Sequence, residues 1–123
     1  SLVMCLFANV PPRSTLELAN RATGFDYTLE DLMQVGRRGW TMKRIFNHRL
    51  GLTAENDRLP GIALQPLPDG GSAGYVPPFE EMKAAYYAAR GWDPVTGKPT
   101  PITLTGLGLD EYADDLWGDG SPR

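Results

Sequence analysis

The sequence contains one cysteine, Cys5, and one histidine, His48. No second His, Cys or Asp lies near His48 at metal-ligand spacing, and no local partner would orient it as a base. We therefore interpret His48 as a histidine on the face of a helix. Cys5 lies in the apolar stretch "SLVMCLF", where a lone cysteine is usually an inert core residue. It could ligate an iron–sulfur cluster only if the other thiolates came from elsewhere, because such clusters take four.

A basic run, "RRGWTMKRIFNHR" at 37–49, could hold phosphates, because Arg37, Arg44 and His48 fall almost one above another on a helix. However, the net charge is -3 and the pI is about 5.0, and no nucleic-acid module pattern accompanies the run. We expect no nucleic-acid partner, and we expect the stripe to be solvated or paired with acids. The glycine-rich stretch 70–74 lacks the strand and lysine of a phosphate loop and is interpreted as flexible.

The composition describes a modest globular protein. At 123 residues and 41% hydrophobic content, the chain can bury a small core. No apolar stretch approaches the roughly 20 residues that span a bilayer, and the apolar start lacks the pattern of a signal peptide. One cysteine forms no internal disulfide, so we place the protein in the reducing cytoplasm, without a membrane partner.

Residues that typically begin or end helices occur along the whole chain. Ser14 is predicted to cap a helix that ends at Gly24, and Thr28 a second helix that reaches about Leu50. A single turn is expected from Thr53, because "LPG" follows it. The clearest helix lies in "PPFEEMKAAYYAARGWD", and a turn followed by a short helix is expected over 100–118. The fold class is therefore all-α, an irregular single domain over 1–123 of about four to six short helices with long loops.

Periodicity also predicts which faces are buried. The second helix should bury a broad apolar face (Leu32, Met33, Gly36, Trp40, Phe46 and Leu50). The helix near 79–90 should turn a stripe inward (Phe79, Met82, Tyr86 and Ala89). Residues 61–77 have neither period, and such a loop needs support from neighbouring structure. Together with the apolar start, this loop leads us to expect a piece of a larger protein.

Four stretches, taken in order along the chain, resemble the C-terminal helical domain of the aldehyde:ferredoxin oxidoreductase family of tungsten-pterin enzymes. They are "SLVMCLF", "YTLEDLMQVGRRGWTMKRIFNHRLGLTAENDRLP", "FEEMKAAYYAARGWDPVTGKPT" and "LTGLGLDEYADDL". They cover nearly the whole chain collinearly. The family's G-E-R reads Gly36-Arg37-Arg38 here, and its paired acids before L-P read Asn56-Asp57, so the local charge differs.

The resemblance implies the role of one residue in this chain. Cys5 matches the last cysteine ligand of the family's 4Fe-4S cluster, and no residue of 1–123 matches a catalytic position. The implied parent enzyme oxidises aldehydes to carboxylic acids with a tungsten (or molybdenum) bispterin. It passes electrons through the cluster to ferredoxin. These residues alone are expected to bind no cofactor and to be inactive. Their expected partners are the N-terminal and middle domains of the parent chain, which could itself form a homo-oligomer.

Several alternatives stay open at the level of sequence. A non-catalytic helical interaction module derived from the same domain is the second interpretation, with 61–77 and the acidic tail 110–119 as its surface. A nucleic-acid binder ranks last. The resemblance does not distinguish tungsten from molybdenum. It also leaves open a related branch that reduces aromatic acyl-CoA substrates.

Overall fold

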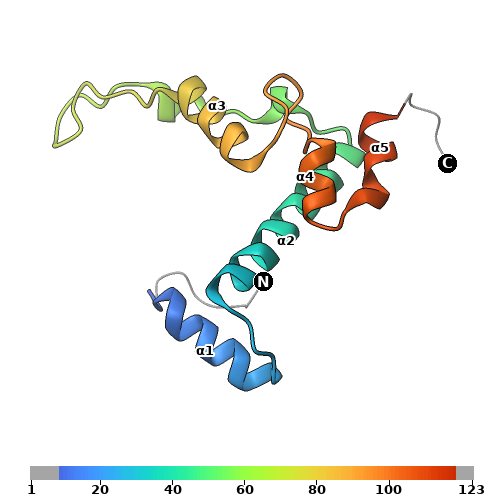
Figure 1. Ribbon diagram of the computed structural model, residues 1–123. Coiled ribbons are helices and arrows are strands. Elements are labelled where there is room, and N and C mark those ends of the chain that lie inside the picture. The colour runs from blue at the N-terminus through green and yellow to red at the C-terminus, as the bar shows by residue number, and fades with distance from the viewer. Residues whose placement is uncertain (1–8, 119–123) are drawn as a thin grey trace. The chain divides into compact units, whose positions relative to one another are not determined.

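The structure, a computed structural model, describes residues 9–118, which form helices and contain no β-strand (Figure 1). The prediction of an all-α fold is confirmed. The α-helices are α1 (Pro12–Thr23), α2 (Leu29–Arg49), α3 (Phe79–Arg90), α4 (Pro101–Gly106) and α5 (Ala113–Trp117). The shorter 3-10 helices are η2 (Ala54–Asn56), η3 (Gly61–Leu64) and η4 (Asp110–Tyr112).

The chain divides into two compact units, residues 1–43 and residues 44–123. The boundary falls within α2, so the first unit holds α1 and most of α2. The second unit holds the last turns of α2 and all later elements. That residues 1–123 form a single domain stays a prediction.

In the first unit, α1 begins two residues before the predicted cap. Pro12 occupies the first helical position and Pro11 the N-cap, without a side-chain cap. The predicted role of Ser14 is therefore wrong, because proline, with its fixed φ and missing N–H, is suited to the first turn. The C-terminal prediction is confirmed, since Gly24 is left-handed at φ 75° and ends α1.

The start of α2 follows the prediction closely. The Asp31 backbone N–H donates to Thr28 Oγ1 at 3.2 Å, and the Thr28 backbone N–H donates to Asp31 Oδ2 at 2.8 Å. This reciprocal arrangement satisfies two backbone donors at the start of the helix, as in a capping box. The hydrogen bonds to Thr28 hold the pKa of Asp31 below its ordinary value.

The second unit is built on a small apolar core. Ile45 of α2 packs with Leu104, Leu109 and Leu116 from the C-terminal segment, and each of them is buried. The C-terminal helices α4 and α5 are short, and this core includes one residue of α2, Ile45. The predicted inward face of α2 is therefore wrong here, because Phe46 is 61% exposed.

The inward stripe predicted for α3 is also wrong. Met82 is 56% exposed, and the buried residue of this helix is Tyr87. A polar group explains the difference, because the Tyr87 hydroxyl reaches the buried side chain of Arg44. Along residues 9–118, no helix combines the length and apolar character needed to cross a membrane.

Candidate functional site

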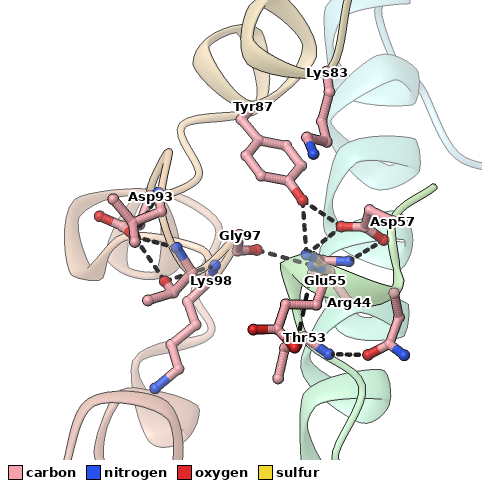
Figure 2. A network of polar contacts seen from close by, with 12 residues as sticks. Arg44, Thr53, Glu55, Asp57, Lys83, Tyr87, Asp93, Gly97 and Lys98 are labelled. Atoms are coloured by element: carbon pink, nitrogen blue, oxygen red, sulfur yellow. Dashed lines mark hydrogen bonds and ion pairs between the residues drawn. The ribbon is translucent and has the colours of Figure 1, made fainter. Parts of the chain in front are cut away.

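The most connected polar group of the second unit is the Arg44 side chain, which is 6% exposed. It donates from Nε to the Gly97 carbonyl at 2.9 Å and from Nη1 to Asp57 Oδ1 at 2.9 Å. Arg44 Nη2 lies 2.6 Å from Asp57 Oδ2 and 3.3 Å from the Tyr87 hydroxyl (Figure 2). A buried guanidinium is tolerated only when its charge and donors are satisfied, and Arg44 meets this requirement.

Asp57 and Tyr87 complete the network around the guanidinium. The Tyr87 hydroxyl also donates to Asp57 Oδ2. Burial and the neighbouring carboxylate raise the pKa of Tyr87 to about 12. Burial alone would raise the pKa of Asp57, but the hydrogen bonds from Arg44 and Tyr87 outweigh it and hold that pKa below its ordinary value. Asp57 is therefore a carboxylate and Tyr87 a neutral phenol at neutral pH.

A tight turn over 92–99 positions the Gly97 carbonyl beside Arg44. An isolated bridge joins Trp92 and Pro99, and the Asp93 carboxylate accepts from the Thr96 backbone N–H and hydroxyl, both at 2.7 Å. Gly97 is left-handed at φ 68°, and a Cβ there would lie 2.1 Å from Arg44 Nη2. Glycine is therefore required at this position, both for its backbone conformation and for the close approach of the arginine.

Aromatic rings enclose the guanidinium. The Arg44 Cζ lies 4.9 Å from the centroid of Trp92 and 5.7 Å from that of Tyr87, within the range of cation–π attraction. Within the described residues, the buried atoms His48 Nε2 and Trp92 Nε1 have no hydrogen-bond partner. Burial lowers the pKa of His48, and the positive charges of Arg44 and Lys98 lower it further.

These contacts describe a link between elements rather than a reaction centre. The carboxylate, guanidinium and phenol satisfy one another, so none of them is poised as a nucleophile or a base. The network instead ties α2, the end of η2, α3 and the 92–99 turn together around one buried charge.

The sequence-based expectations meet this geometry only in part. Arg44 is paired, one of the two outcomes expected for the basic stripe. His48 lies on α2 as expected, although its Nε2 is buried. Asp57, Tyr87 and Gly97 were not predicted from the sequence to share a site. The feature of the sequence that could have indicated this site is Gly97, which lies in a turn that contains Pro94 and Pro99.

Cys5 lies outside the described residues. Among residues 9–118 there is no group of three or more His, Cys, Asp or Glu side chains that could hold a metal ion. Whether Cys5 is a cluster ligand therefore stays a prediction.

A known protein family matches most of the chain. A family model described as "Aldehyde ferredoxin oxidoreductase, domains 2 & 3" matches residues 1–109. The match includes the first three stretches quoted above and residues 104–109 of the last one. It also covers every residue of the Arg44 network.

Individual relatives agree with the family match. A tungsten-containing aldehyde ferredoxin oxidoreductase of Pyrococcus furiosus is 39% identical over 98 residues, which is 78% of this chain and 16% of the relative. The enzyme of the same name from Pyrococcus abyssi is 37% identical over the same shares. That of Thermococcus kodakarensis is 38% identical over 78 residues, 62% of this chain and 13% of the relative. The chain thus spans about a sixth of the length of these relatives or less. No solved structure matches the chain.

Proposed function

Because the chain belongs to the aldehyde ferredoxin oxidoreductase family, we propose that it forms the C-terminal part of a tungsten (or molybdenum) pterin enzyme that oxidises aldehydes to carboxylic acids. In such an enzyme the metal–pterin centre supplies the two-electron oxidation, and an iron–sulfur cluster passes electrons singly to ferredoxin. The observation that carries the proposal is the family match over residues 1–109. Residues 1–123 alone would be inactive.

Within that enzyme, this chain would give the iron–sulfur cluster a single ligand, the thiolate of Cys5. A 4Fe-4S cluster takes four thiolates, and the sequence contains one cysteine. The other three would come from the N-terminal and middle domains of the parent chain. Cys5 lies within the matched span, and its apolar neighbours would limit the access of water to the cluster.

The described residues would contribute to the enzyme by positioning its parts. The buried charge of Arg44 is satisfied internally, by Asp57 and the Gly97 carbonyl. The Arg44 network would hold the second unit in one shape against the domains that carry the cofactors. A metal-free helical interaction module is the alternative, supported by the long exposed segment described below.

The first test is metal analysis of the native polypeptide that contains these residues, purified without oxygen. Tungsten or molybdenum together with about four iron atoms per chain would support the enzyme. A folded native polypeptide with neither metal nor iron would favour the interaction module.

The second test concerns Cys5 in the same polypeptide. We expect Cys5→Ala to lower the iron content and to abolish the electron paramagnetic resonance signal of the reduced cluster. Cys5→Ser, which retains an oxygen ligand, should preserve part of the iron. Trp117→Phe leaves the sulfur chemistry unaltered and is the control for a general effect of substitution. Full iron and an unchanged signal in Cys5→Ala would remove Cys5 from the cluster.

A further inference from the structure

Residues 60–76, called here the docking segment, are exposed at every position. Their large apolar side chains are Ile62 (81% exposed), Leu64 (40%), Leu67 (56%), Tyr75 (60%) and Val76 (41%). Asp69 is the single charged residue of the segment. Many exposed apolar side chains within one short segment indicate an interaction site, because apolar surface leaves water favourably.

The docking segment has a local shape of its own. The Ala63 backbone N–H donates to the Pro60 carbonyl at 2.9 Å, and the Gly74 N–H donates to the Leu67 carbonyl at 3.0 Å. An isolated bridge joins Leu67 and Ala73. The three prolines of the docking segment restrict its backbone further. A preformed segment loses less conformational entropy when it binds, and this favours a docking role.

Both ends of the docking segment lead back to the Arg44 network. Asp57 precedes the segment by three residues and pairs with Arg44, and Tyr87 of α3, the helix that follows the segment, donates to the same carboxylate (Figure 2). Figure 1 shows the chain leaving η2 and returning at the start of α3. The buried guanidinium therefore fixes the base from which the apolar segment is presented.

We infer that the docking segment packs, through its apolar side chains, against an uncharged surface of the upstream domains of the parent enzyme. This inference rests on the proposed function, which supplies those domains. The matched family region is described as domains 2 and 3, and the Pyrococcus furiosus relative has 84% of its length outside the match, since the aligned part is 16%. The upstream partner must be apolar, because a single carboxylate is all the charge that the segment offers.

A second copy of the chain is the other candidate for this surface. It would have to associate from solution and lose translational freedom, whereas upstream domains in the same polypeptide are held at a high effective concentration. The tethered partner is therefore favoured on physical grounds.

The test is hydrogen–deuterium exchange of the full native polypeptide, followed in peptides that cover residues 60–76. We expect amide exchange in the docking segment to be at least about 100-fold slower than in an unprotected chain. The protection should be independent of protein concentration. Free exchange of the segment overturns the inference. Protection that appears only in a dimer assigns the surface to a second copy and also overturns it.

A matched pair of variants sharpens the test. Ile62→Asp puts a carboxylate on the docking segment, and we expect exchange over residues 60–76 to become at least about tenfold faster. Val95→Asp is the control, because Val95 is 80% exposed, like Ile62, but lies in a turn surrounded by Asp93, Thr96 and Lys98. It should leave the exchange of the segment within about twofold. Equal effects of the two variants would contradict a specific contact at Ile62.

Failure of the docking inference can be distinguished from failure of the proposed function. Tungsten, molybdenum and iron are measured in the same preparation before exchange begins. A protected segment in a metal-free polypeptide would refute the enzyme and retain an upstream docking partner. An unprotected segment in a metal-loaded polypeptide would retain the enzyme and refute the docking.

Discussion

Arg44 and Asp57 form a two-point ion pair across the base of the docking segment, with Nη1 to Oδ1 at 2.9 Å and Nη2 to Oδ2 at 2.6 Å. The arginine is 6% exposed and the aspartate 32%. Exposed ion pairs contribute little to stability, whereas removing one partner of a buried pair leaves an uncompensated charge. This asymmetry makes Asp57 a sensitive position, although it stands in a loop.

Asp57→Asn should therefore destabilise the protein. We expect the free energy of unfolding to fall by about 3 kcal/mol, at the lower end for a buried pair because Asp57 is partly solvated. Urea denaturation followed by tryptophan fluorescence measures the change. Glu80→Gln is the control, because it breaks the ion pair between Glu80 and Lys83, in which Glu80 is 77% exposed. It should cost about 0.5 kcal/mol or less. A similar loss in both variants would show that burial of Arg44 contributes nothing.

Gly97→Ala should be more damaging than the same change at another left-handed glycine. At Gly97 (φ +68°) the new Cβ would lie 2.1 Å from Arg44 Nη2 and 2.9 Å from the Tyr87 hydroxyl. Gly51 (φ +84°), which lies outside the docking segment, has no such neighbour within 4 Å, so Gly51→Ala reports the backbone strain alone, about 1 kcal/mol. We expect Gly97→Ala to lower the free energy of unfolding by about 1–3 kcal/mol more than Gly51→Ala. Thermal unfolding of the two variants measures this difference, and equal values would contradict the close approach of Arg44.

Acidification should destabilise the protein through His48. Burial, together with Arg44 and Lys98, lowers its pKa from 6.5, while the Gly97 backbone and the charge of Asp57 oppose the shift. The folded state therefore binds fewer protons than the unfolded state, and the free energy of unfolding falls as pH drops through and below about 6.5. The contribution of Asp57, whose pKa is lowered from 3.8, is lost only at lower pH.

His48→Gln isolates this effect. A neutral side chain at position 48 should flatten the dependence of the unfolding free energy on pH between about 5 and 7. Urea denaturation at several pH values measures the slope, and the native protein provides the comparison. If both proteins have the same slope in this interval, His48 is not the group that responds.

Local chemistry made part of the fold predictable. Gly24 ends α1 because only glycine takes φ 75° without strain. Thr28 begins α2 because its hydroxyl meets the free N–H of Asp31. Thr53 likewise opens η2, with Asn56 Oδ1 accepting from its backbone N–H at 2.8 Å. Each of these signals acts within a few residues, so the sequence displays it directly.

Burial was less predictable. Periodicity favoured Phe46 of α2 and Met82 of α3 as inward residues, yet the structure buries Ile45 and Tyr87. A helix shows which residues share a face, but the neighbouring elements decide which face is covered. In the second unit the coverage comes from short C-terminal helices and from a polar contact, neither of which a helical period encodes.

The sequence by itself determined the helical class, the helix ends at Gly24, Thr28 and Thr53 and, through collinear resemblance, the family to which residues 1–109 belong. The tertiary structure alone decided that Arg44 is buried with Asp57, Tyr87 and the Gly97 carbonyl. The partners of Arg44 are separated from it by 13, 43 and 53 residues. Pairing over such separations depends on how the chain packs, because a charge is buried only where folding has brought its hydrogen-bond partners together.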